Sequence, residues 1–163
     1  MLPLLDTHLH LLYRDKANYA WTKDIPPLAE GNFSLDDYRS LTDGYGVGGS
    51  IFMEVDADNY QEESKFIKSV ADKSDTLNGL IVSIRPETDE GFESWLNESI
   101  EMGVLGYRRI LHVCPDDMSQ SDIFRNNIRK IGKAEKTFDM CFLSKQLPIA
   151  LELAKTCDNT NLI

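Results

Sequence analysis

The sequence is poor in cysteine, in basic residues and in long apolar runs, and each shortage excludes a class of protein. The three cysteines are odd in number and show no C-x-x-C spacing, which argues against a disulfide framework and favours a reduced, cytoplasmic setting. Lys and Arg number 17 against 27 Asp and Glu, and the resulting net charge of −10 disfavours nucleic-acid binding. No apolar run is long enough to span a membrane, and the N-terminal stretch lacks the basic residues of a signal peptide. We therefore expect a soluble single domain over residues 1–163.

Short β-type runs alternate with longer amphipathic segments along the whole chain. The runs are rich in β-branched and aromatic residues, as are the strands of a buried parallel sheet. They cover residues 2–12, 48–56, 79–86, 106–113 and 137–144. A helical stripe follows each run: the first starts at a capping-box pattern formed by Ser34 and Asp37, and the last has Pro148 in its first turn. The order predicts five βα units.

Glycine is missing where a nucleotide-binding fold needs it. The first predicted strand is followed by YRDKANYAWTKDIPP, which has no phosphate-binding glycine turn, and the glycine-rich stretch GYGVGGS precedes a strand instead of opening a helix. The pattern therefore favours an α/β fold of the TIM (β/α)8-barrel type over a doubly wound sheet. Such a barrel needs about 250 residues. Since DNTNLI at the C-terminus reads as the approach to a sixth strand, we expect the N-terminal part of a longer barrel.

Histidine is also scarce, yet two of the three histidines stand one residue apart in DTHLH. Side chains alternate between the two faces of a strand, so His8 and His10 are predicted to project together, with Asp6 on the same face. In a barrel that face is the lumen, and the carboxyl ends of the strands form the active site. Two imidazoles placed there suit a divalent metal or a proton-transfer role. A purely structural pair is the competing interpretation.

The sequence resembles the amidohydrolase-2 branch of the amidohydrolase superfamily along nearly its whole length. The likeness rests on DTHLHL, on YAW in the following loop, on GYRRIL in the fourth run and on FDMCF with QLPIALELA near the end. It implies a TIM-barrel hydrolase, usually a sugar-lactone or pyrone-dicarboxylate lactonase, with zinc in some relatives and no metal in others. The branch carries further site residues on its sixth and eighth strands. Without them His8 and His10 would form an incomplete zinc site.

Two arginines and an aspartate are candidates for binding an anionic substrate. Arg108 matches the arginine of the G-x-R pattern of the branch, and a guanidinium in a lumen suits a carboxylate. Arg85, at the end of the third run, is a weaker candidate, as is His112. Asp139 also matches a position of the branch, where it either holds a polar group or has a structural role. Arg109 faces the other way, and we expect it to pair with a helix carboxylate.

Glu54 and Trp21 complete the candidate substrate site. Glu54 falls at the end of the second run. It either contacts a metal or the substrate, or is an ordinary charged residue at a strand end, and the two interpretations are equally supported. Trp21, with Tyr19, lies in the long loop after the first strand. These aromatics either cover the pocket or pack the loop down, and the two roles are compatible.

The leading hypothesis is therefore a cytoplasmic lactonase in which His8 and His10 form the catalytic or metal site. Its partner would be a small anionic substrate, with no nucleic acid or membrane involved, and a homo-oligomer stays open. The alternatives are a zinc-dependent decarboxylase of the same superfamily and a non-catalytic fragment. We expect residues 1–163 alone to be inactive.

Overall fold

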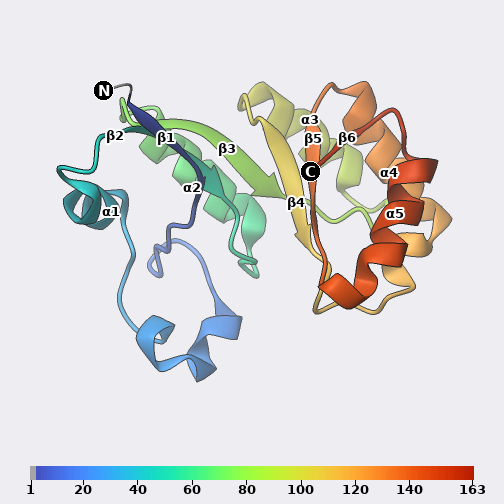
Figure 1. Cartoon of the computed structure of the whole chain (residues 1–163), viewed down its shortest axis with the longest axis horizontal. Helices are drawn as coiled ribbons and strands as arrows, with labels where there is room; N and C mark the ends of the chain where they lie inside the picture. The colour runs from blue at the N-terminus through green and yellow to red at the C-terminus, as the bar shows by residue number, and fades with distance from the viewer. Residues whose placement is uncertain (1–2) are drawn as a thin grey trace. The chain divides into compact units, whose positions relative to one another are not determined.

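The computed structural model describes residues 3–163, in which strands and helices alternate from one end to the other (Figure 1). The chain divides into two compact units, the first ending at Val82 and the second covering Ser83–Ile163. None of the helices within residues 3–163 is long and apolar enough to cross a membrane.

The first unit is a parallel sheet with two α-helices. Its strands are β1 (Leu4–Leu9), β2 (Val47–Met53) and β3 (Leu77–Ser83), of which the last ends at the boundary between the units. Its helices are α1 (Leu35–Thr42) and α2 (Tyr60–Ala71), together with the short 3-10 helices η1 (Ala20–Asp24) and η2 (Pro26–Leu28). β2 lies between β1 and β3 and pairs in parallel with both. This arrangement directs the carboxyl ends of its strands to one edge of the sheet.

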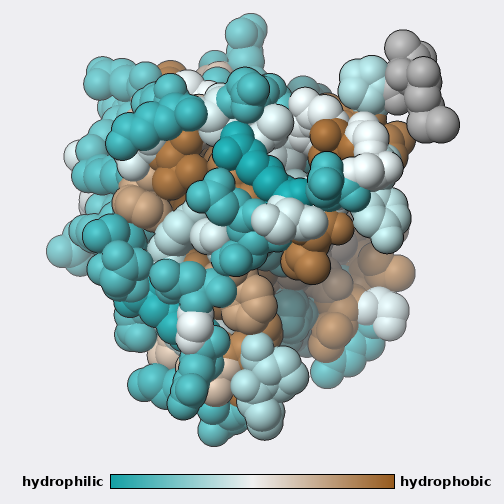
Figure 2. All heavy atoms as spheres, turned by 90° about the vertical axis from the view of Figure 1, so that its left-hand side faces the viewer, coloured by the Kyte–Doolittle hydropathy of each residue, from teal (hydrophilic) through white to brown (hydrophobic). Residues whose placement is uncertain are grey.

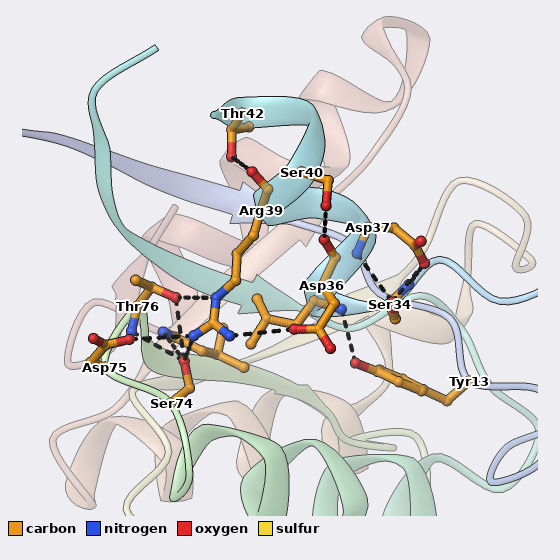
Figure 3. A network of polar contacts seen from close by, with 12 residues as sticks. Tyr13, Ser34, Asp36, Asp37, Arg39, Ser40, Thr42, Ser74, Asp75 and Thr76 are labelled. Atoms are coloured by element: carbon orange, nitrogen blue, oxygen red, sulfur yellow. Dashed lines mark hydrogen bonds and ion pairs between the residues drawn. The ribbon is translucent and has the colours of Figure 1, made fainter. Parts of the chain in front are cut away.

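Polar contacts fix where α1 begins and how it is held (Figure 3). The predicted capping box is confirmed: the Ser34 hydroxyl accepts from the Asp37 N–H at 3.2 Å, and the Asp37 carboxylate accepts from the Ser34 N–H at 2.9 Å. Further along the helix, Arg39 donates to Ser74 Oγ at 2.9 Å and to Thr76 Oγ1 at 3.0 Å. The helix is thereby tied to the turn that precedes β3.

The surface of the first unit mixes polar and apolar side chains (Figure 2). Leu4 and Leu5 on β1 and Leu41 on α1 are exposed, with 55% or more of their surface accessible. Within residues 3–163, β1 pairs only with β2. Phe52 on β2 and Ile67 on α2 are fully buried and belong to the apolar core of this unit.

The second unit repeats the same pattern. Its strands are β4 (Gly106–Ile110), β5 (Thr137–Cys141) and β6 (Asn161–Leu162), and β5 pairs in parallel with both neighbours. Its α-helices are α3 (Phe92–Glu101), α4 (Asp122–Lys133) and α5 (Leu147–Thr156), and its 3-10 helices are η3 (Met118–Gln120) and η4 (Ser144–Gln146). Pro148 lies in the first turn of α5, as predicted.

All five predicted strands are present, and β6 confirms the expected sixth strand at the C-terminus. Each predicted run extends past the real strand: the second by three residues after Met53, and the fourth by three after Ile110. The first run also began at Leu2, which lies outside the described residues. Glu54, Arg85 and His112 consequently stand just after the strands, at the starts of the βα loops. The element order is that of consecutive βα units of a TIM barrel.

The close approach of β4 and β5 explains why the GYRRIL motif begins with a glycine, Gly106. A Cβ atom at this position would lie 2.9 Å from the carbonyl oxygen of Thr137 on β5 and would also overlap the Thr137 hydroxyl. We predict that Gly106→Ala lowers the free energy of unfolding by about 2–3 kcal/mol, because the two strands must separate. Urea unfolding measures this change.

Two further variants make the Gly106 prediction specific. Leu105→Ala, at an exposed position one residue earlier, should change stability by less than about 0.5 kcal/mol. Adding Thr137→Ala to Gly106→Ala should restore part of the loss, since it removes the hydroxyl but leaves the carbonyl. A Gly106→Ala protein as stable as the parent would show that β4 and β5 do not approach this closely.

Candidate active-site residues at the carboxyl ends of the strands

His8 and His10 project to the same side of β1, as alternation predicts. Leu9 and Leu11 are buried, with 6% and 1% of their surface accessible, whereas both histidines are exposed. The two imidazole rings lie with their centroids 4.9 Å apart and their planes nearly perpendicular. The pair is therefore a preformed cluster of imidazole nitrogens on the side opposite the apolar core.

A backbone carbonyl orients the His10 ring. His10 Nδ1 lies 2.9 Å from the carbonyl oxygen of Met53, the last residue of β2. A carbonyl oxygen only accepts hydrogen bonds, so this contact places a ring proton on Nδ1. Histidines that bind metal commonly donate their second ring N–H to such an outer partner, which fixes tautomer and orientation. The Met53 carbonyl thus fixes the orientation of the His10 ring.

Asp6 turns to helix α1. Its carboxylate accepts the His8 backbone N–H at 3.0 Å and the Tyr38 hydroxyl at 2.7 Å. These two hydrogen bonds lower the pKa of Asp6, with a further contribution from the nearby histidines, while burial and Asp6 raise the pKa of Tyr38 to about 12. The β1–β2 register shifts between Asp6 and Leu9, so regular alternation is interrupted there. Asp6 thus braces β1 against α1.

Glu54 and Trp21 lie at the carboxyl end of β2. Glu54 is fully buried, and its carboxylate accepts the backbone N–H of Asp56 at 2.8 Å. Asp56 itself has φ of 56°, the left-handed conformation that non-glycine residues seldom adopt. The Trp21 indole N–H donates to the Val55 carbonyl at 2.8 Å, and 42% of the side chain remains exposed. Trp21 therefore fastens the long loop to this end of β2 while still presenting part of its ring to solvent.

The long loop has a core and a clamp of its own. Tyr19 is buried, with 2% of its surface accessible, in a cluster with Leu12, Ala17, Val55 and Ala57, so it packs the loop down. Arg14 donates to the carbonyl of Gly31 at 2.8 Å and to Thr22 Oγ1 at 3.1 Å, and also contacts the Leu28 carbonyl. No sequence pattern predicted this clamp. It holds the loop in a defined shape next to Trp21.

Arg108 and Asp139 are direct neighbours on the second unit. They are partners in the β4–β5 register, and so are Tyr107 and Phe138 one residue earlier. The Tyr107 hydroxyl contacts Ser99 on α3 at 2.7 Å, and the Phe138 ring packs against Phe124 on α4. Because strand side chains alternate, Arg108 and Asp139 face away from these helices. Arg108 is largely buried, with 7% of its surface accessible.

The other two arginines make different contacts. Arg109 donates to the Glu87 carboxylate from Nε at 3.0 Å and from Nη2 at 2.8 Å, so the expected ion pair exists. Its carboxylate comes from the loop after β3 and not from a helix, because that loop is the nearer neighbour of β4. Arg85 follows β3 directly, contacts the Ser83 hydroxyl and reaches the Ile84 carbonyl at 3.4 Å.

Metal-binding capacity among residues 3–163 is limited to pairs. Within this range no three or more His, Cys, Asp or Glu side chains gather as a metal site would require. His8 and His10 fit as two of the ligands of a zinc site, given their common side and the fixed ring of His10.

Searches against protein-family models and against curated proteins give no match. A search of solved structures does find similar folds. An amidohydrolase 2 from Bifidobacterium longum subsp. infantis superposes with a TM-score of 0.78 and 19% identity, covering 99% of this chain and 60% of its own. The chain thus has the fold of part of a TIM barrel. An amidohydrolase from Burkholderia multivorans with bound zinc gives 0.80 and 18%, over 99% of this chain and 56% of its own.

The same fold occurs with different chemistries. A probable 2-pyrone-4,6-dicarboxylic acid hydrolase from Acinetobacter baumannii, with citric acid bound, gives a TM-score of 0.62 and 15% identity, over 85% of this chain and 49% of its own. Decarboxylases share the fold as well. This chain spans about 60% or less of the length of the three proteins described with TM-scores. The βα units described above therefore correspond to part of a TIM barrel.

Proposed function

We propose that the protein is a hydrolase that opens the ring of an anionic lactone, either of a sugar acid or of a dicarboxylic acid. The observation that carries the proposal is the His8–His10 pair, in which the two rings lie 4.9 Å apart and the Met53 carbonyl holds the His10 ring through Nδ1. The fold shared with a probable pyrone-dicarboxylic acid hydrolase supports a lactone as substrate. The net charge of −10 supports a small molecule over nucleic acid as the partner.

In the proposed reaction water adds to the lactone carbonyl carbon, the ring C–O bond breaks, and a hydroxy acid is formed. We assign His8 and His10 either to holding a divalent cation or to moving protons at their ring nitrogens. A cation such as zinc, when bound, would supply polarisation of the lactone carbonyl. Glu54 and Trp21 would shape and border this site in the first unit, because both are fixed at the end of β2.

We assign recognition of the substrate carboxylate to Arg108. A guanidinium binds a carboxylate through two parallel hydrogen bonds, and Arg108 is on the side of β4 that faces away from the helices. Asp139 would orient it from the neighbouring strand. Arg85 is a second candidate for the same anion, since it also follows the carboxyl end of a strand.

A substrate panel tests the proposal on the full-length protein. Anionic lactones, neutral lactones and hydroxybenzoates are incubated separately, with acid release followed at constant pH and carbon dioxide followed by mass spectrometry. We expect hydrolysis of an anionic lactone, at a rate at least about tenfold above that of a neutral lactone of equal ring size. Carbon dioxide release from a hydroxybenzoate without any lactone hydrolysis would instead establish the decarboxylase alternative. Inactivity on every member of the panel would contradict both.

A further inference from the structure

Cys141 and His112 form a cysteine–histidine pair in the second unit, outside the roles assigned above. Cys141 is the last residue of β5, and His112 stands two residues after the end of β4. The Cys141 sulfur lies 3.4 Å from His112 Nδ1. The backbone holds this geometry, because the Cys141 carbonyl accepts the N–H groups of both Leu111, at 3.1 Å, and His112, at 3.0 Å.

We propose that Cys141 is a nucleophilic thiol activated by His112, and that the pair is a site of covalent modification by soft carbon electrophiles. The reactive form of cysteine is the thiolate, which an adjacent imidazole favours by taking the proton. His112 is exposed and Cys141 is partly exposed, so a small electrophile has access to the sulfur.

The chemical step is a displacement. The thiol proton passes to His112 Nδ1, and a sulfur lone pair forms the new S–C bond. The leaving group departs from the same carbon with its bonding electrons. The imidazolium then loses its proton to water, and the histidine is ready to act again.

The other two cysteines of the chain have environments that favour the protonated thiol. The Cys114 sulfur donates to the Ile110 carbonyl at 3.2 Å, and a hydrogen bond of this kind stabilises the S–H form. Cys157 is fully buried, and burial raises the pKa of its thiol. Cys141 differs from these two environments in the imidazole nitrogen of His112, 3.4 Å from its sulfur. The chain therefore contains two internal controls for Cys141.

Charged residues also stand on the strands and the loop next to Cys141 and His112. Asp139 precedes Cys141 by two residues on the same side of β5, and Arg108 is its register partner on β4. On the loop after β4, Asp116 accepts a hydrogen bond from Gln146 at 2.7 Å. A carboxylate disfavours a nearby thiolate and a guanidinium favours it, so Asp139 and Arg108 act on Cys141 with opposite signs.

Alkylation by iodoacetamide, followed at each cysteine by peptide mass spectrometry, tests the proposal on the unaltered full-length protein. At pH 7 we expect Cys141 to react about tenfold faster than Cys114, and Cys157 to react last. The rate at Cys141 should also level off at a lower pH than the rate at Cys114. In denaturant the three rates should become alike, because the advantage depends on the folded geometry.

Variants separate activation from simple exposure. His112→Asn should reduce the rate at Cys141 to that of Cys114, while Val113→Ala, at an exposed neighbouring position, should leave it unchanged. If Cys141 and Cys114 show equal rates and the same pH profile in the unaltered protein, the proposal is wrong. It is equally wrong if His112→Asn folds normally and Cys141 reacts as before.

Discussion

Replacing both histidines of β1, as His8→Ala/His10→Ala, is expected to lower kcat/KM for lactone hydrolysis by at least about 10³-fold while leaving the protein folded. The loss in activity should be large because the two imidazoles act as one unit, either as cation ligands or as proton carriers. The stability cost should be small. Both side chains are exposed, and the ring hydrogen bond from His10 to the Met53 carbonyl is worth about 1 kcal/mol.

A control variant and a zinc measurement make the histidine experiment decisive. Thr7→Ala, at an exposed position between Asp6 and His8, is the matched control and should retain full activity. Bound zinc, measured by elemental analysis, distinguishes the two roles: loss of zinc together with activity indicates ligands, and loss of activity alone indicates proton carriers. A double variant that hydrolyses lactone at the parent rate would remove His8 and His10 from the site altogether.

Side-chain direction could be predicted from the sequence because it depends on a local rule. Alternation along a strand placed His8 with His10, and it placed Arg108 opposite to Arg109; the ring geometry and the Arg109–Glu87 ion pair agree with both. The capping box at Ser34 was equally local. These features need only a few neighbouring residues, and no knowledge of which strands pair.

Strand ends could not be predicted because burial continues beyond them. The residues just after β2, β3 and β4 include Val55, Ile84 and Leu111, each at least 95% buried. The apolar run in the sequence therefore continues past the end of each strand. The contact from His10 to Met53 and that from Cys141 to His112 were also out of reach. Each joins the last residue of one strand to a residue just past the end of its neighbour, and depends on a register that a single sequence does not reveal.

Arg108→Met is expected to lower kcat/KM for an anionic lactone by roughly 30- to 1,000-fold, which corresponds to about 2–4 kcal/mol of lost binding to the substrate carboxylate. Methionine keeps most of the apolar stem of arginine, so the packing around this buried position is largely retained. For a neutral lactone of the same ring size the change should stay within about threefold, since no carboxylate is then lost. The effect should appear mainly as a higher KM if Arg108 binds the carboxylate equally strongly in the ground state and in the transition state.

Arg109→Met is the matched control, because it makes the same arginine-to-methionine change at the adjacent residue. It breaks the largely buried ion pair with Glu87 and should lower the free energy of unfolding by about 2–4 kcal/mol, without altering the preference for anionic over neutral lactones. The comparison therefore separates substrate binding from structural pairing within one dipeptide. If Arg108→Met instead slows both lactones equally and destabilises the protein as Arg109→Met does, then Arg108 serves the sheet together with Asp139, and the substrate carboxylate must be bound elsewhere.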